Sequence, residues 1–379
     1  MSAPGLYVHV PFCARACPYC DFDFQVGRTP PVAEFLAALE RECRLREVEP
    51  GLGLRTVYIG GGTPSMLGPE GMRQLLRWIG ERFDLREVVE RTVELNPEHI
   101  DEALLDALRE QGVDRVSLGV QSLGTDALAE LGRVHRAEQA RRALVSCVEH
   151  GLRVSADLIV GWPGQTRAQL LADLAGVLET GIDHLSIYAL TVEPGTPWER
   201  LAARGRRGVP DADAQADRLS EAAQFLGEAG FEHYEVASYC RPGARAQHNH
   251  GYWTWRDYLG LGPSAASARH CADGSVHRRT NRRGFGAWAA APNDETSEER
   301  LEPGEAAVEG LWVGLRALDG FEVAAWRARF PVYDEPWLRA AVARQLAKGN
   351  LDWTNGVIRV AEGRWLWHDE IGADLLTAG

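Results

Sequence analysis

Three cysteines lie close together in the stretch Tyr7-Val8-His9-Val10-Pro11-Phe12-Cys13-Ala14-Arg15-Ala16-Cys17-Pro18-Tyr19-Cys20. Three residues separate the first pair and two separate the second, so one short loop can aim all three thiolates at one inorganic cluster. Proteins hold iron–sulfur clusters through thiolates, and three cysteines on a four-iron cluster leave one iron open. An open iron can bind a substrate or cofactor, which predicts a reaction centre.

Zinc and disulfide bonds are the alternative uses of these cysteines. Zinc could take His9 as a fourth ligand, but structural zinc sites usually draw their ligands from two separated pairs, and the chain has no second pair. A disulfide framework is disfavoured because the other cysteines are isolated and the total of seven is odd. Of the isolated cysteines Cys43, Cys147, Cys240 and Cys271, the first two fall on apolar helical stripes typical of core residues.

Length and composition limit the class of protein. A chain of 379 residues predicts one large catalytic unit with a smaller appendage. The hydrophobic fraction of 45% and the charged fraction of 25% are those of an ordinary globular protein. A net charge of −13 argues against a nucleic-acid partner, because a phosphate backbone needs a dense basic face. Lys348 is the only lysine, which disfavours Schiff-base chemistry and a lysine-dependent phosphate loop.

The sequence pattern indicates neither a leader peptide nor a membrane span. The N-terminal residues lead into a strand without a basic and then apolar leader, and no apolar run approaches the length of a membrane span. We therefore expect a cytoplasmic protein with no transmembrane segment, in a compartment that keeps thiols reduced. Peripheral contact with a membrane partner stays open.

Short β-rich runs alternate with amphipathic helical patterns. Helical spacing joins Val32, Phe35, Leu36, Leu39 and Cys43, and again Met72, Leu75, Leu76, Ile79 and Phe83. Repeated βα units predict an α/β fold with a parallel sheet, closed or partly closed into a barrel, and with its chemistry at the carboxyl ends of the strands. The expected strands are 6–10, 56–59, 91–95, 115–118, 154–160, 184–190 and 234–237.

Polar or glycine-rich groups follow six of these strands. The first strand leads to the cysteines and the second to Gly60-Gly61-Gly62-Thr63-Pro64-Ser65, where glycines allow a close backbone approach to a ligand. For any single segment taken alone, a plain turn or a solvated polar residue is the favoured interpretation. The other strand ends carry Glu94 with Asn96, Gly119–Ser122, Asp157 with Gly161–Gly164, and Tyr188-Ala189.

In this order, the segments resemble the radical S-adenosylmethionine enzymes of the oxygen-independent coproporphyrinogen dehydrogenase family. The resemblance rests on Tyr7–Cys20, Gly60–Ser65, Glu94, Gly119–Ser122, Asp157–Pro163 and Tyr188–Thr196, and it covers essentially the whole chain. It implies a partial (β/α)6 barrel that holds a 4Fe-4S cluster and S-adenosylmethionine. The cluster ligands would be Cys13, Cys17 and Cys20, and the methionine part of the cofactor would chelate the fourth iron.

The same resemblance assigns the S-adenosylmethionine site. Tyr7 would lie beside the methionine part and Tyr19 beside the adenine, while Ala189 and Ala266 match backbone positions near the adenine. A guanidinium suits the methionyl carboxylate, and a carboxylate suits the ribose hydroxyls or the ammonium. Gly61, Gly62 and Thr63 would receive the amino group near Glu94, and Gln121, Arg133 and Asp157 resemble residues that contact the carboxylate and ribose.

Two departures distinguish branches of this family. The dehydrogenases carry a fourth cysteine two residues after Cys20, where this chain has Phe22. The segment 247–253 contains His-Asn-x-x-Tyr-Trp, formed by His248, Asn249, Tyr252 and Trp253, and it resembles the hallmark of the HemW heme chaperones. Gly260–Ala265 follows, as in that group.

The motif brings together chemistry that suits heme. His248 could bind iron and the two aromatic rings could cover a porphyrin, with His250 and His233 as alternative ligands. The basic run His277, Arg278, Arg279, Arg282 and Arg283 could meet the heme propionates, although a solvated loop is the favoured interpretation.

The C-terminal part reads as a small helical module. Helices are expected over 305–318, 323–330, 335–346 and 371–376, and a hairpin joins 351–353 to 357–360 through Asn355-Gly356. This resembles a winged-helix-like domain whose tryptophans serve packing. The acidic segment Pro292–Pro303 is the predicted linker, which gives expected domains over 1–240 and 291–379 and a heme-motif and connecting region over 241–290.

Three functions remain compatible with the sequence. The first is a heme chaperone that binds heme and delivers it to recipient hemoproteins, as the chaperone resemblance implies. The second is a coproporphyrinogen III dehydrogenase, and the third is a radical enzyme with another substrate. Phe22 and the His248–Trp253 motif favour the first, so we expect dehydrogenase activity to be absent, while S-adenosylmethionine cleavage stays open.

Overall fold

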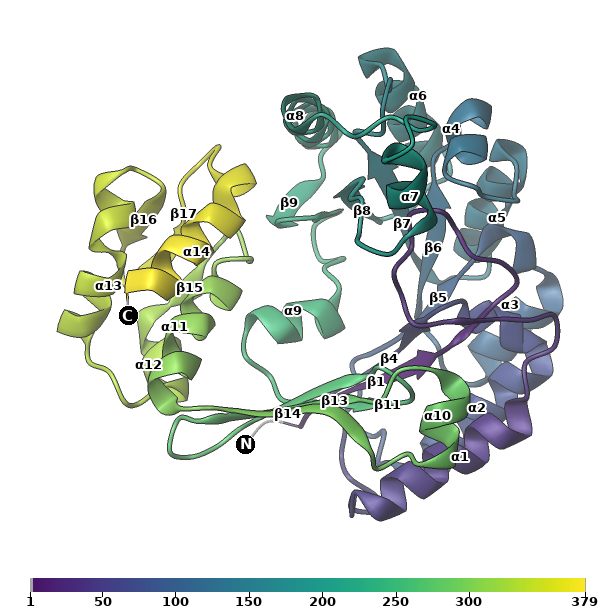
Figure 1. Ribbon diagram of the computed structural model, residues 1–379, viewed down its shortest axis with the longest axis horizontal. Coiled ribbons are helices and arrows are strands. Elements are labelled where there is room, and N and C mark those ends of the chain that lie inside the picture. Colours follow the sequence, from purple (N-terminus) through teal and green to yellow (C-terminus); the bar gives the residue numbers. More distant parts are fainter. Residues whose placement is uncertain (1–2, 379) are drawn as a thin grey trace.

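The computed structural model describes residues 3–378 and is built around one large sheet. In this part of the chain, a 12-stranded sheet has the order β14-β13-β12-β11-β1-β4-β5-β6-β7-β8-β10-β9 (Figure 1). The neighbouring strands β11, β1, β4, β5, β6, β7 and β8 are parallel to one another. The strands outside this run pair antiparallel. The bounds in the central sheet are β1 Gly5–Val10, β4 Thr56–Gly61, β5 Glu90–Leu95, β6 Arg115–Gln121, β7 Arg153–Val160, β8 His184–Ala189 and β11 Tyr258–Leu261.

The helices between the parallel strands pack on the outer side of this sheet (Figure 1). Helix α1 shows why: Phe35, Ala38, Leu39 and Cys43 recur at helical spacing and are all buried against the sheet. The helices of this part are α1 Val32–Leu45, α2 Gly68–Arg82, α3 Glu102–Glu110, α4 Thr125–Glu130, α5 Ala137–Glu149, α6 Arg167–Leu178, α7 Pro197–Ala202 and α8 Ala212–Glu228, with short 3-10 turns η1 Pro64–Leu67 and η2 Pro97–His99.

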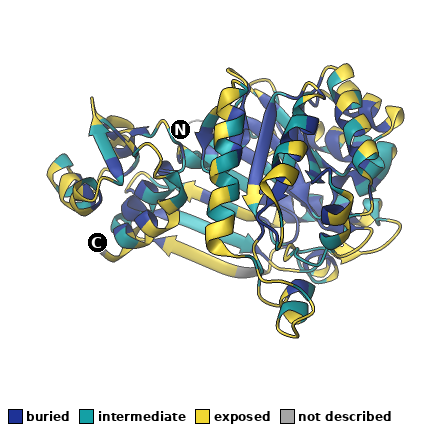
Figure 2. Ribbon diagram, turned by 90° about the horizontal axis from the view of Figure 1, so that it is seen from above, coloured by how far each residue is buried: buried dark blue, intermediate teal, exposed yellow. Residues whose placement is uncertain are grey.

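The segment after β8 extends both edges of the sheet. One edge ends in β10 and β9, and the other is a meander of β12, β13 and β14, whose outer strand is largely exposed (Figure 2). The bounds are β9 Glu232–Glu235, β10 Ser238–Cys240, α9 Gln247–Trp253, β12 Ala266–His270, β13 Val276–Asn281, α10 Phe285–Ala290 and β14 Glu295–Leu301, and a small separate pair joins β2 Phe12–Cys13 to β3 Gln25–Val26.

The C-terminal part has its own hydrophobic core. Its buried cluster joins Trp326, Phe330 and Leu338 to Trp255 and Leu301, apart from the core beneath the large sheet. The predicted domain 291–379 begins with β14, the outer strand of the meander, and we propose that the described elements after β14 form a unit that packs onto the meander. Its elements are α11 Pro303–Gly314, β15 Phe321–Glu322, α12 Val323–Arg329, α13 Glu335–Ala347, β16 Leu351–Thr354, β17 Val357–Val360, η3 Trp365–Trp367 and α14 His368–Ala378.

The predicted α/β architecture with a smaller C-terminal module is confirmed. All seven expected strands are present within a few residues of their predicted ends, and β15, β16 and β17 form a small sheet beside helices. The predicted Asn355-Gly356 turn joins β16 to β17, and both residues have positive φ, at 53° and 79°.

The predicted linker Pro292–Pro303 is wrong, because Glu295–Leu301 forms strand β14. Its register places Glu298 and Glu299 opposite Arg279 and Arg278 of β13. Cross-strand pairs of opposite charge stabilise an exposed edge strand. The segment therefore forms a strand although its sequence lacks the alternation of apolar and polar residues that is typical of one. Within residues 3–378, no helix has both the length and the apolar character that crossing a membrane requires.

Candidate functional site

The carboxyl ends of the parallel strands surround a cavity of about 520 Å³, here called the cysteine cavity. The strands that end at this cavity are β1 and β4 to β8, because parallel strands all end at the same edge of the sheet. Most of the predicted cluster and cofactor residues line it, namely Cys13, Cys17, Cys20, Tyr19, Gly61, Gly62, Thr63, Glu94, Gln121, Arg133, Asp157 and Ala189.

The three cysteines are free thiols in the loop after β1. Burial raises the pKa of Cys13, and it raises the pKa of Cys20 to about 11. Metal ligation requires thiolates, so binding of a cluster here would release protons. Within residues 3–378, no three His, Cys, Asp or Glu side chains are grouped to hold a single metal ion, whereas a cluster binds each cysteine through a separate iron.

Arg133 lies beside the cysteines. Its guanidinium donates to Cys17 Sγ at 3.7 Å, to Asn96 Oδ1 at 2.8 Å and to the carbonyl of Gly119 at 2.9 Å. The structure therefore places Arg133 against the loop that carries the three cysteines, with the strand ends of β5 and β6 holding it there.

The glycine turn at the end of β4 packs closely against Phe12 and Cys13 and lies beside Glu94. A Cβ on Gly62 would stand 3.1 Å from Cys13 Sγ and 3.0 Å from the carbonyl oxygen of Phe12, and Gly61 has φ 117°. Glu94 accepts hydrogen bonds from Tyr58 Oη at 2.7 Å and from the Gly61 N–H at 3.1 Å. Burial raises the pKa of Glu94 to about 7, against the effect of the Tyr58 hydrogen bond.

Asp157 lies on β7, which β6 separates from β5 and Glu94. Ser117 Oγ donates to it, with both carboxylate oxygens at 3.0 Å, and burial raises its pKa to about 6. Gln121 has φ 66°, where a shift of register interrupts the pairing of β6 with β7. Such a conformation costs energy and is common at functional sites.

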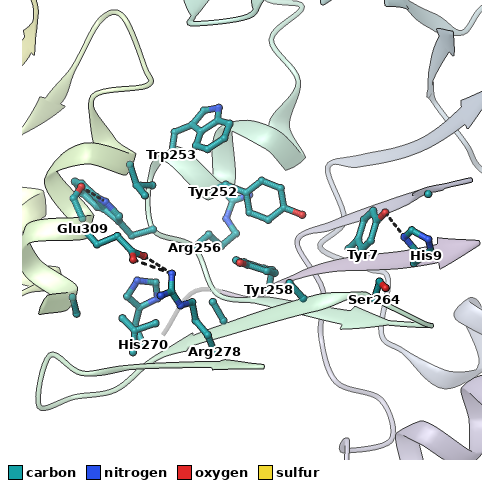
Figure 3. A pocket seen from close by; sticks show the side chains of 18 of the residues that line it. Tyr7, His9, Tyr252, Trp253, Arg256, Tyr258, Ser264, His270, Arg278 and Glu309 are labelled. Carbon is teal, nitrogen blue, oxygen red and sulfur yellow. Dashed lines mark hydrogen bonds and ion pairs between the residues drawn. The ribbon is translucent and has the colours of Figure 1, made fainter. Parts of the chain in front are cut away.

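A second cavity of about 680 Å³, here called the aromatic cavity, lies between the large sheet and α11 (Figure 3). Tyr252, Trp253, Tyr258, Trp255 and Phe330 line it. Tyr7 and Ala266, which the sequence assigned to the S-adenosylmethionine site, line this cavity too. Asp21, Phe22, Gly61 and Glu94 line both cavities, so the two adjoin.

The predicted heme motif is divided by the structure. Tyr252 and Trp253 face the aromatic cavity, whereas His248 and Asn249 are absent from its described lining. His248 is 2% exposed, and its Nδ1 and Nε2 are hydrogen bonded to Thr56 Oγ1 at 2.8 Å and Tyr252 Oη at 2.7 Å. Burial lowers the pKa of His248 to about 3. Neither ring nitrogen is open for iron in this arrangement.

The alternative histidine ligands also lie elsewhere. His250 lines a neighbouring cavity on the other side of Trp253. His233 stacks on Tyr239 at 4.1 Å between ring centroids, and neither histidine lines the aromatic cavity.

The basic run at 277–283 is largely occupied by protein partners. Arg278 forms ion pairs with Glu299 and Glu309, and Arg282 pairs with Asp294. Arg279 donates to the backbone carbonyl of Asn293. These contacts correct the expectation of a solvated loop, because β13 uses its arginines to bind β14 and α11.

Several cavity residues escaped the sequence analysis. Asp257, His270 and Glu309 belong to the aromatic cavity or support it, and none of them lies in a motif that the sequence analysis identified. Ser117 sits inside a strand, and only its cross-strand position beside Asp157 makes it a site residue. A resemblance to motifs does not reveal such partners.

Comparison with known proteins places these cavities in context. Residues 7–175 match the model of the radical SAM superfamily. The chain is 40% identical to a protein named heme chaperone HemW from Mycobacterium tuberculosis strain H37Rv, over 69% of this chain and 68% of that one. It is 33% identical to heme chaperone HemW from Lactococcus lactis, over 86% and 84%, and 36% identical to that from Escherichia coli, over 74% of each.

One solved structure has nearly the same overall fold. Coproporphyrinogen III oxidase (HemN) from Escherichia coli, described as a radical SAM enzyme, superposes with a TM-score of 0.82 over 99% of this chain and 90% of that one. The sequence identity is 23%. This likeness concerns the fold.

Proposed function

The chain belongs to the HemW family of heme chaperones within the radical S-adenosylmethionine superfamily, and we propose that it binds heme and delivers it to recipient hemoproteins. The aromatic cavity carries this proposal. Its volume of about 680 Å³ suits a ligand of porphyrin size, and its walls are largely aromatic and aliphatic. Flat rings such as Tyr252 and Trp253 can cover a macrocycle and exclude water.

The cysteine cavity fits a 4Fe-4S cluster on Cys13, Cys17 and Cys20. The three soft donors line one cavity, Arg133 supports the sulfur of Cys17, and Gly62 allows the turn after β4 to approach Cys13 closely. A bound cluster supplies one-electron chemistry and an open iron for S-adenosylmethionine.

The remaining strand ends would bind S-adenosylmethionine. Glu94 and Asp157 are buried carboxyl groups that a cationic cofactor would hold in the ionised form, and the Gly61–Thr63 turn offers backbone groups to the amino end. Tyr19, Gln121 and Ala189 complete the wall. Tyr7 and Ala266 approach from the aromatic cavity, which would place the cofactor at the junction of the two cavities.

The adjoining cavities support a chaperone with two linked sites. Phe22 lines both cavities and is 61% exposed, where the related dehydrogenases carry a cysteine. We propose that this ring separates bound heme from the cluster and cofactor. Recipient hemoproteins would then approach the open side of the aromatic cavity.

Heme titration tests the proposal. The purified protein, with and without a reconstituted cluster, should bind one heme per chain and show a Soret band of bound heme. Trp253→Ala should weaken binding because it removes a wall of the cavity, while His150→Ala, which changes a histidine directly after α5, should bind heme like the parent. Heme-loaded protein is then mixed with apo-cytochrome b to follow transfer. A parent that binds no heme would exclude the chaperone function.

A further inference from the structure

The aromatic cavity needs an open nitrogen if a histidine is to bind heme iron. Its two lining histidines are His9 and His270. His9 uses both ring nitrogens, with Nδ1 at 3.0 Å from Tyr7 Oη and Nε2 at 2.8 Å from the carbonyl oxygen of Asp23. It is therefore closed to a metal, as His248 is.

His270 differs in having one engaged nitrogen. It ends β12, and its Nδ1 lies 2.9 Å from Asp257 Oδ1, whereas Nε2 makes no hydrogen bond within the described part of the chain. The carboxylate favours the tautomer with the proton on Nδ1, which leaves the lone pair on Nε2. Metal-binding histidines commonly carry such a carboxylate on the second nitrogen, because it orients the ring and raises its basicity.

The imidazole of His270 is held firmly at the cavity wall. Asp257 also accepts from the backbone N–H of His270 at 3.0 Å and from Arg329 at 2.5 Å. The ring of Phe330 packs edge-on with its centroid 5.9 Å away. The side chain of His270 is 10% exposed and belongs to the lining of the aromatic cavity (Figure 3).

The same cavity also has an arginine that is available to pair with a carboxylate of the ligand. Of its three lining arginines, Arg278 is paired with Glu299 and Glu309, and Arg283 donates to the backbone carbonyl of Asp21. Arg256 has no carboxylate within ion-pair distance among the described residues, and it donates to the Gln247 carbonyl at 3.4 Å. A half-buried guanidinium without an anion gains from a ligand carboxylate that accepts two hydrogen bonds.

We propose that His270 binds the iron of heme through Nε2 and that Arg256 binds a heme propionate. This inference rests on the proposed heme-binding function and assigns the contacts within that cavity. His248 then has a structural role: it joins α9 to β4 through Thr56 and positions the Tyr252 hydroxyl.

The iron ligand is tested by titrating the full-length protein with ferric heme. His270→Ala should shift the Soret band, remove the nitrogen-ligated signal from the electron paramagnetic resonance spectrum and weaken binding about tenfold or more. Added imidazole should restore the spectrum, which a merely structural role would not allow. His150→Ala is the histidine control, and circular dichroism verifies folding.

The outcomes separate the two proposals. If the parent binds no heme, the proposed function fails. If the parent binds heme and folded His270→Ala keeps the parent spectrum, the function stands and His270 is excluded as the ligand.

The propionate contact is tested with a matched pair of ligands. Arg256→Gln should weaken binding of heme about tenfold and leave the affinity for heme dimethyl ester unchanged, because the ester lacks the carboxylates. Arg86→Gln, on an exposed loop with 86% exposure of the arginine side chain, is the control. Equal losses for both ligands, or no loss for heme, would overturn the assignment of Arg256.

Discussion

At the scale of single residues, hydrogen-bond partners decide which of several similar side chains remain available to a ligand. His248 and His270 are both histidines near the aromatic rings, but the first has two protein partners and the second has one. The same distinction separates Arg278 from Arg256. Residue type and motif cannot make this distinction, since it depends on strands that are remote in the chain.

The cysteines provide the first prediction at this scale. Replacing Cys13, Cys17 or Cys20 by serine should strongly reduce bound iron and sulfide after anaerobic reconstitution, because a hydroxyl is a poor substitute for a soft thiolate. Cys271→Ser is the matched control, since this half-exposed cysteine lies in the turn after β12. Full cluster loading of Cys17→Ser, or its loss in Cys271→Ser, would contradict the ligand assignment.

The raised pKa of Glu94 predicts a pH-dependent stability. Folded Glu94 keeps its proton up to about pH 7, whereas an unfolded glutamate ionises near its ordinary value of about 4.3. The contribution of this group to folding is therefore complete below about pH 4 and is lost as the pH rises through 7. Relative to Glu94→Gln, the parent without added cofactor should lose about 1–3 kcal/mol between pH 5 and 8.

Urea unfolding at a series of pH values measures this difference. Glu34→Gln, on the exposed face of α1, should show a difference from the parent that does not change with pH. A constant difference for Glu94→Gln as well would mean that Glu94 is ionised in the folded protein.

At the scale of elements, one buried carboxylate joins α1 to the meander. Glu42 is fully buried and accepts hydrogen bonds from the Gly262 N–H at 2.9 Å, Asn281 Nδ2 at 2.7 Å and Trp288 Nε1 at 3.2 Å. Arg46 completes the set at 2.7 Å. These partners come from α1, the segment after β11, β13 and α10, so a single side chain fixes how the meander meets the parallel sheet.

Glu42→Ala should therefore destabilise the protein by about 3–5 kcal/mol, because it removes the buried carboxylate that pairs with Arg46 and accepts hydrogen bonds from three other donors. Chemical unfolding followed by circular dichroism measures the effect. Glu34→Ala, on the exposed face of the same helix, should cost less than about 1 kcal/mol. Similar losses for both variants would show that the network contributes little.

Elements that form from a local sequence pattern can be predicted from the sequence, whereas elements that depend on partners remote in the chain cannot. Strands such as 154–160 combine β-branched and apolar residues and end at a turn, so a local pattern suffices to find them. β14 has no such pattern, and its pairing with Arg278 and Arg279 depends on a register that local periodicity does not encode. The strand-end residues of the cysteine cavity were predictable for the same local reason, whereas the Asp257–His270 pair was not.

At the scale of the whole molecule, the aromatic cavity depends on how the C-terminal unit sits against the meander. Glu309, Gly310 and Val313 of α11 form one wall. Trp255 Nε1 donates to the Gly310 carbonyl at 2.8 Å, and Arg278 reaches Glu309, so the contact between the units also shapes the cavity. The cysteine cavity, by contrast, belongs to the strand ends of the large sheet.

The proposed heme contacts predict that the protein will not convert coproporphyrinogen III to protoporphyrinogen IX. Decarboxylation would require a propionate held against the reactive carbon of the cofactor-derived radical, whereas we propose that Arg256 binds a propionate and that Phe22 stands between heme and the cofactor. Phe22, 61% exposed between the cavities, also places an apolar ring where the dehydrogenases carry a thiol. Cleavage of S-adenosylmethionine under strong reduction is compatible with this expectation, because it needs only the open iron and the bound cofactor.

The assay is anaerobic incubation with S-adenosylmethionine, dithionite and coproporphyrinogen III, followed by chromatography, with a coproporphyrinogen dehydrogenase as the positive control. Catalytic formation of the doubly decarboxylated product would contradict the chaperone function and establish the dehydrogenase in its place.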